Sequence, residues 1–203
     1  MTAGPTGRRG RPRSDASERA IVEAALDMMA EGHGASAITI SELARRAGVG
    51  KDTLYRRWRT KDDLLLHALG SLHGPPDAHA DGPIREVLIA RLAELIARMH
   101  DERNQRIYRS LLTACGGHPA LRERFYAEVI GPRRDATRAV IAAAARRGEL
   151  RADTDPGLVG ALLFSPVLAE TLEGRPRRPL RGAPRTVATR LVDAVLAGAL
   201  PRA

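Results

Sequence analysis

A chain of 203 residues is long enough for one or two domains with a buried core, and its formal net charge of +9 favours a polyanionic partner. A lone cysteine, Cys115, excludes an intramolecular disulfide framework and suits a reducing cytoplasm. No apolar run approaches the roughly 20 residues of a membrane span, and no hydrophobic stretch of a signal peptide follows the basic N-terminus, so we expect a cytoplasmic protein without a membrane partner.

Residues 1–14 are expected to form a disordered basic arm because they are rich in Gly, Pro and Arg. The stretch Arg9-Gly10-Arg11-Pro12-Arg13 resembles an AT-hook core, in which a narrow extended chain lies in an AT-rich minor groove. A solvated tail is the alternative. The arm leads directly into the helices described next, as the arms of homeodomains do, and this favours minor-groove contacts by Arg9, Arg11 and Arg13.

Residues 15–31 predict a first helix. Asp15 and Glu18 provide a capped start, and apolar residues then recur at helical spacing up to Gly32. Met28 and Met29 are interpreted as core residues of this helix.

Residues 39–58 contain two short helical patterns joined by a three-residue turn. Thr39 is expected to cap the first helix, and Glu42 three residues later would complete a capping box. Gly48 tolerates the left-handed backbone conformation that the end of a helix often requires. The arrangement predicts a helix-turn-helix.

The second of these helices is predicted over residues 51–58, with Leu54 and Trp58 turned toward the core. Residues 43–61 hold seven basic side chains and one acid, so they contribute +6 of the net charge of +9. A helix-turn-helix whose second helix presents cations to solvent fits the major groove of DNA. The residues left on its outer face are Lys51, Asp52, Tyr55, Arg56 and Arg57.

Residues 16–76 resemble the DNA-binding domain of the TetR (tetracycline-repressor) family. The resemblance is carried by Thr39, Leu43-Ala44, Ala47-Gly48-Val49, Lys51, Thr53-Leu54-Tyr55, Trp58, Lys61 and Leu64-Leu65. Gly50 departs from the family, in which many members have Ser or another polar cap, but glycine is an acceptable N-cap. The resemblance implies an all-α fold, with a three-helix helix-turn-helix DNA-binding domain over residues 15–76 and a helical effector-binding and dimerisation domain over residues 77–203.

The same resemblance implies which side chains contact a double-stranded DNA operator. Lys61, at the start of a fourth helix capped by Thr60, is expected to clamp a phosphate. For any single arginine, a solvated surface position is the alternative. The candidate contacts are Thr39, Arg45, Arg46, Lys51, Asp52, Thr53, Tyr55, Arg56, Arg57 and Lys61.

The rest of the chain, after a loop rich in Gly and Pro, contains helical patterns and no strand-like alternation. They cover residues 84–100, 105–115, 119–147, 155–172 and 185–200, with kinks expected at Gly131-Pro132 and at Pro166. The last two are apolar on more than one face. The resemblance implies that they pack against their two-fold mates as a four-helix bundle, although burial within one chain is the alternative. A homodimer predicts an operator that is an imperfect palindrome.

An effector pocket is implied among the fourth to eighth helices. Aromatic residues are only 3% of the chain, so we expect an aliphatic pocket. Core packing is the alternative for each candidate lining residue. These candidates are Met99, His100, Tyr108, Cys115, Phe125, Tyr126 and Phe164.

The sequence therefore predicts a homodimeric repressor that a small-molecule effector releases from its operator. A constitutive or architectural DNA-binding regulator without an effector is the alternative. No catalytic constellation or nucleotide fingerprint is present, so we expect neither an enzyme nor a cofactor. Cys115 and His118 lie near each other but lack further ligands, so no metal site is expected.

Overall fold

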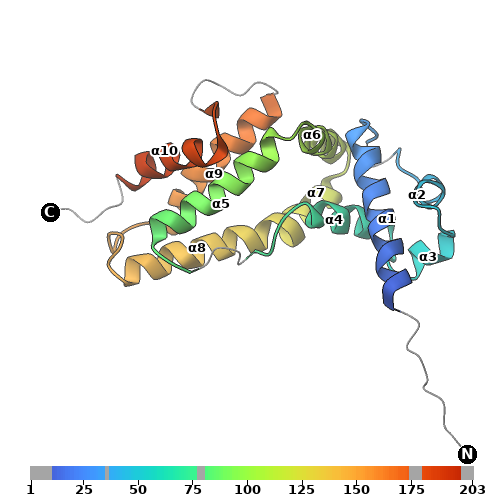
Figure 1. Ribbon diagram of the computed structural model, residues 1–203, viewed down its shortest axis with the longest axis horizontal. Helices are drawn as coiled ribbons and strands as arrows, with labels where there is room; N and C mark the ends of the chain where they lie inside the picture. Colours follow the sequence, from blue (N-terminus) through green and yellow to red (C-terminus); the bar gives the residue numbers. More distant parts are fainter. Residues whose placement is uncertain (1–10, 35–36, 77–80, 174–179, 198–203) are drawn as a thin grey trace, which may run out of the picture.

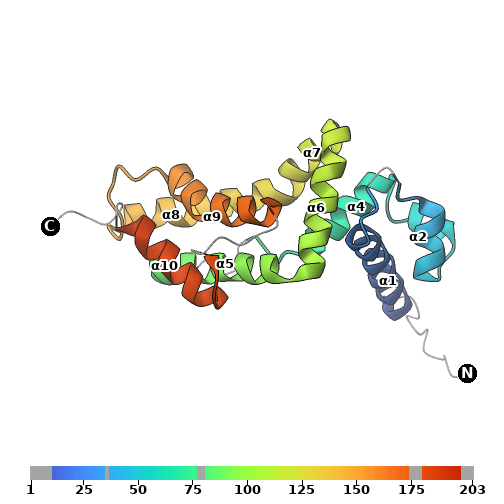
Figure 2. The ribbon, with the colours of Figure 1, turned by 90° about the horizontal axis from the view of Figure 1, so that it is seen from above.

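The computed structural model describes residues 11–34, 37–76, 81–173 and 180–197, and every regular element in these ranges is helical. The predicted all-α fold is confirmed. Figures 1 and 2 show an elongated molecule with one group of helices at each end and two helices between them. Buried side chains from both groups form one continuous hydrophobic cluster. Among the described residues, no helix is both long and apolar enough to cross a membrane.

The first group of helices is the helix-turn-helix end of the molecule (Figure 1). It consists of α1 (Arg11–Ala30), α2 (Ile40–Ala47), α3 (Lys51–Tyr55) and α4 (Lys61–Ser71). The central helices are α6 (Glu102–Gly117) and α7 (Pro119–Phe125), followed by a π-helical turn at Tyr126–Ile130. The second group consists of α5 (Ile84–His100), α8 (Gly131–Arg146), α9 (Pro156–Glu173) and α10 (Pro184–Leu196).

Helix α1 begins at Arg11, four residues before the predicted start at Asp15. Pro12 is compatible with this early start because a first helical turn needs no N–H from its residues. Arg11 and Arg13 therefore lie in a helix, and the prediction of an extended, disordered arm through residue 14 is wrong for them. Arg9 lies outside the described residues.

The local signals around the two-helix motif are largely confirmed. Thr39 accepts a hydrogen bond from the Glu42 N–H at 3.2 Å, and Gly48 ends α2 with φ at 66°. Only this hydrogen bond of the predicted capping box forms. The Glu42 carboxylate, which would complete the box, accepts hydrogen bonds from Arg45 and Arg46. Thr60, by contrast, caps α4 with a complete capping box, in which the Asp63 carboxylate accepts from the Thr60 N–H.

Helix α3 is shorter than predicted, because it ends at Tyr55 and the chain continues as a turn to Trp58. The Arg57 and Trp58 N–H groups both donate to the Leu54 carbonyl within this turn. Leaving the helix here buries Trp58 in the core and still allows Thr60 the extended conformation that caps the next helix. The inward positions of Leu54 and Trp58 are confirmed.

The predicted kink at Gly131-Pro132 takes the form of the π-helical turn before it. The Gly131 N–H donates to the Tyr126 carbonyl, five residues back, and Pro132 has no N–H to donate. A Cβ at position 131 would lie 3.0 Å from that carbonyl oxygen, so glycine permits this close approach.

Candidate nucleic-acid interface and effector cavity

The outer surface of α3 is formed by polar residues that do not pack into the core. Lys51, Asp52 and Arg56 are exposed, Tyr55 is 57% exposed, and Thr53 is half-buried. Buried Leu54 fixes the rotation of this short helix, so these five side chains share its outward side. In a major groove, cations on such a helix can bind phosphates, and its hydrogen-bonding groups can contact base edges.

Arg57 does not share this surface, and the prediction that it faces outward is wrong. Its side chain is 15% exposed, and its Nη1 donates to the Glu18 carboxylate of α1 at 2.6 Å. The other Glu18 oxygen lies 3.5 Å from His67 of α4. Arg57 thus ties the end of the motif to α1 and α4, and its position is set by a partner 39 residues away.

We expect Arg57→Ala to lower the free energy of unfolding by about 1–3 kcal/mol, because it removes a charge-assisted hydrogen bond that is largely shielded from water. Arg56→Ala, one residue earlier on the exposed surface, should change it by less than about 0.5 kcal/mol. Urea unfolding of the two variants measures the difference. Equal destabilisation by both would contradict the assigned role of Arg57.

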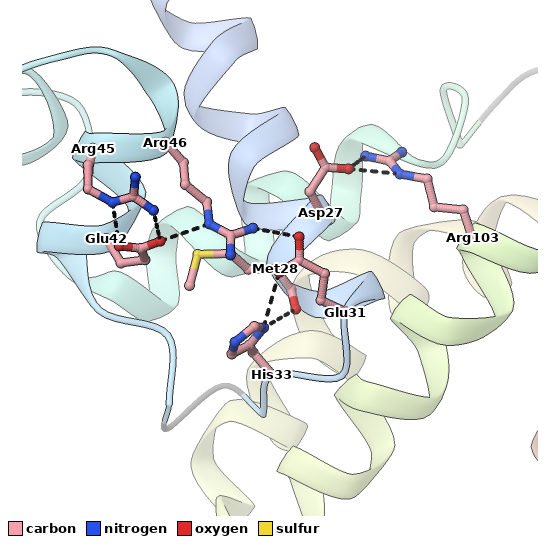
Figure 3. Close-up of polar contacts among 8 residues, drawn as sticks. All are labelled: Asp27, Met28, Glu31, His33, Glu42, Arg45, Arg46 and Arg103. Carbon is pink, nitrogen blue, oxygen red and sulfur yellow. Dashed lines mark hydrogen bonds and ion pairs between the residues drawn. The ribbon is translucent and has the colours of Figure 1, made fainter.

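Arg45 and Arg46 of α2 belong to an ion-pair network, which Figure 3 shows. Arg45 donates to Glu42 at 2.6 Å, and Arg46 donates both to Glu42 at 2.9 Å and to Glu31 at 2.6 Å. These hydrogen bonds lower the pKa of Glu42 to about 2, so the carboxylate stays charged. The side chain of Arg45 is 71% exposed and that of Arg46 is 27% exposed. A phosphate would therefore compete with Glu42 for Arg45 and with two carboxylates for Arg46.

Arginines of α6 and α7 help to join the helix-turn-helix end to the rest of the protein. Arg103 of α6 donates to Asp27 of α1 at 2.8 Å, as Figure 3 also shows. Arg124 of α7 donates to Asp63, the capping residue of α4, at 2.8 Å. Asp63 has a lowered pKa because of the hydrogen bonds from Arg124 and Thr60. The start of α4, where Lys61 lies, is thus connected to α7, one of the two central helices.

A cavity of about 320 Å³ lies among α5, α6, α8, α9 and the connector that follows α4. We define the connector as residues 73–76. Of the predicted lining residues, Tyr108 and Phe164 line this cavity. Four others do not line it: Met99 and Phe125 are buried in the core, and His100 and Tyr126 are exposed. The side chain of Cys115 lies outside the described residues, so its predicted place in the pocket is not tested.

The chemistry of the cavity differs from the aliphatic pocket that we expected. Apolar side chains such as Leu95 and Leu168 do line it, but so do five arginines. Composition could not reveal this, since arginine is abundant everywhere in the sequence. The lining arginines are Arg91, Arg98, Arg133, Arg134 and Arg138.

The connector is bound to the cavity wall through His73. Arg98 donates to His73 Nδ1 at 3.2 Å, and His73 Nε2 lies 2.7 Å from the hydroxyl oxygen of Tyr108. Burial, together with Arg98 and Arg133, lowers the pKa of His73 to about 3, and burial raises the pKa of Tyr108 to about 12. Both groups are therefore neutral near pH 7. No sequence motif indicates this cluster, because its members come from the connector, α5, α6 and α8.

Comparison with known proteins places the chain in a family. Residues 21–68 match the family described as "Bacterial regulatory proteins, tetR family", and residues 78–195 match "Tetracyclin repressor-like, C-terminal domain". The second match alone covers more than half of the chain. The protein belongs to the TetR family. It is a DNA-binding transcriptional regulator, as members of this family are, and not an enzyme.

One curated relative and two solved structures are similar to most of this chain. The uncharacterized HTH-type transcriptional regulator YdeS of Bacillus subtilis is 26% identical over 167 residues, which are 81% of this chain and 83% of YdeS. A TetR-family regulator from Mesorhizobium loti has a similar fold, with a TM-score of 0.73 at 20% identity over 94% of this chain and 100% of that one. FadR from Bacillus subtilis, solved in complex with stearoyl-CoA, has a TM-score of 0.71 at 16% identity over 89% and 98% of the two chains.

Metal binding finds no support in the part of the chain that the structure describes. There, no three His, Cys, Asp or Glu side chains gather closely enough to hold an ion. His118 is the residue between α6 and α7, and the side chain of Cys115, its potential partner, is outside the described residues.

Proposed function

We propose that this TetR-family regulator is a homodimeric repressor that binds a palindromic operator and is released from it by a small-molecule effector. The observation that carries the DNA-binding part is the outer surface of α3, where Lys51 and Arg56 are exposed next to the half-exposed ring of Tyr55. Lys51 and Arg56 supply charge for phosphates, and Arg56 also suits the acceptor edge of a guanine.

The proposed dimer rests on the exposed face of α9. Six uncharged residues share this face at helical spacing, and Leu158 is 57% and Leu162 51% exposed. Helix α10 has a more polar exposed surface, because the charged residues Arg185, Arg190 and Asp193 lie on it. We therefore propose α9 as the main contact with the second copy, with α10 beside it. The residues of the face are Leu158, Ala161, Leu162, Ser165, Pro166 and Ala169.

The proposed effector site is the arginine-lined cavity. Its 320 Å³ falls within the range of small-molecule sites, and a partly enclosed space of this size favours an effector-responsive repressor over a constitutive regulator. The FadR structure with a similar fold carries stearoyl-CoA, which supports a ligand site in this fold. The connector lines the cavity and continues α4, so an effector there would bias the position of α4 and of Lys61.

An electrophoretic mobility shift tests the DNA-binding proposal, with the intergenic DNA upstream of the gene and with palindromes selected in vitro. We expect the combined exchange of Lys51→Ala and Arg56→Ala to weaken binding at least tenfold. The plot of log K against log salt concentration has a negative slope, and its magnitude should decrease by about 1 for each phosphate that the variant no longer neutralises. The control is the combined exchange of Arg106→Ala and Arg122→Ala, which likewise removes two exposed cations, from α6 and α7, and should have little effect. Failure of the unaltered protein to shift any of these DNAs would overturn the proposal.

A further inference from the structure

The cavity has an excess of positive charge. Among its lining residues, the five arginines face a single carboxylate, Glu94, and His73 is neutral. Glu94 lies 3.9 Å from Arg98, at the limit of an ion pair, and is itself half-exposed. Arg138 also binds Asp135, which does not line the cavity, at 3.2 Å. In a partly enclosed, largely apolar space, an excess of cations over carboxylates is costly and attracts an anion.

Arg133 shows the imbalance most clearly. Its guanidinium donates to two carbonyl oxygens, that of Val129 at 2.6 Å and that of Gly74 at 2.9 Å. In the described ranges of the chain, no carboxylate lies within ion-pair distance of it. Burial, followed by the nearby charge of Arg98, lowers the pKa of Arg133. The guanidinium of half-buried Arg133 therefore donates only to neutral acceptors, although an ionised partner would bind it more strongly.

Tyr108 adds a hydrogen-bond donor at the same place. A guanidinium can only donate, so the bond from Arg98 makes His73 Nδ1 an acceptor. We therefore assign the ring proton of His73 to Nε2, which donates to the Tyr108 oxygen. The hydroxyl proton of Tyr108 then needs another acceptor, and the side chain, only 7% exposed, lines the cavity.

We propose that the effector is an amphiphilic anion, whose carboxylate or phosphate group binds Arg98, Arg133 and the Tyr108 hydroxyl while its apolar part packs along Leu95, Phe164 and Leu168. This inference rests on the proposed function, since it names the chemical class of the ligand for that cavity. Apolar walls around a few convergent polar groups are the usual construction of a small-molecule site.

The same arginines hold the connector, and this links the ligand to DNA. Arg98 binds the ring of His73, Arg133 binds the Gly74 carbonyl, and Arg91 binds the Pro76 carbonyl at 3.2 Å. An ionised group accepts more strongly from a guanidinium than a carbonyl or an imidazole does, so the anion competes with the connector for its anchors. Loosening of the connector changes the restraint on α4, which begins at Lys61.

Isothermal titration of the full-length chain with defined probes tests the proposal. The probes are sodium decanoate and decyl phosphate, with decanol and decylammonium as neutral and cationic controls of the same chain length. We expect one or both anions to bind, and decanol and decylammonium to bind at least tenfold more weakly. Stronger binding of decanoate identifies a carboxylate effector, and stronger binding of decyl phosphate identifies a phosphorylated one.

Variants locate the anion. Arg133→Gln and Tyr108→Phe should each weaken binding of the better probe by about ten- to a hundredfold, since each removes a hydrogen bond to a charged group. Arg106→Gln, an exposed arginine of α6 outside the cavity, is the matched control and should bind as the unaltered chain does. Tyr108→Phe keeps the buried ring, so it remains informative if Arg133→Gln does not fold.

Two results would overturn the inference: decanol or decylammonium binding as tightly as the anions, or both cavity variants binding the anion unchanged. A mobility shift on the same samples separates this inference from the proposed function. A chain that shifts a palindrome but binds neither anion contradicts only the inference. A chain that binds decanoate through Arg133 but shifts no DNA supports the anion site and contradicts the repressor.

Discussion

Leu162→Glu in α9 is expected to convert the proposed dimer into a monomer without unfolding the chain. Leu162 is 51% exposed in the single chain, so a charge there is tolerated in the monomer. In an interface between two copies, the carboxylate would lose its water, which costs several kcal/mol, and two-fold symmetry places this change in both subunits. We expect the dimer to dissociate at least about a thousandfold more readily.

Size-exclusion chromatography with light scattering measures this change, and a mobility shift measures its effect on DNA. A monomer has only one helix-turn-helix and binds a single half-site, so affinity for the palindrome should fall together with dimerisation. Leu112→Glu makes the same substitution at an exposed leucine of α6 and serves as the control. A Leu162→Glu protein that remains dimeric at micromolar concentration would exclude α9 as the main contact.

The second large effect concerns acid stability and His73. Its pKa is about 3 in the folded chain, through burial and the charges of Arg98 and Arg133, against an ordinary value of 6.5. Between these values the unfolded chain binds one more proton than the folded chain, so stability rises with pH. The contribution of neutral His73 is complete above pH 6.5 and is lost as pH falls toward 3, at about 1.4 kcal/mol per pH unit.

His73→Gln removes this titration because an amide neither gains nor loses a proton in the range. Between pH 7.5 and 4.5, the free energy of unfolding of the unaltered protein should therefore fall by about 3 kcal/mol more than that of the variant. Urea unfolding at both pH values gives the difference. His67→Gln, at a half-exposed position of α4, is the matched control and should retain the pH dependence. If the free energy of unfolding falls equally in the unaltered protein and in His73→Gln between these pH values, His73 is not the group responsible.

Features that depend on neighbouring residues along the chain were predictable. Thr39 and Thr60 cap the helices that they precede, Gly48 ends α2 in a left-handed conformation, and residues 84–100 form α5 as expected. Each of these signals acts within one turn of a helix, where sequence distance and spatial distance coincide. The start of α6 was missed although Asp101, its N-cap, is a signal of the same kind.

Sequence by itself therefore determined the all-α class, the helix-turn-helix and membership of the TetR family, because these follow from periodicity, caps and motif residues that are close in the chain. Only the tertiary structure decided which arginines face solvent and which enclose a cavity. Arg57 pairs with Glu18, and Arg98 and Arg133 meet His73 and Tyr108, across separations that no local pattern encodes. An arginine's environment depends on the packing of distant helices, and in a chain with 33 basic residues only that packing distinguishes a DNA contact, a structural ion pair and an anion site.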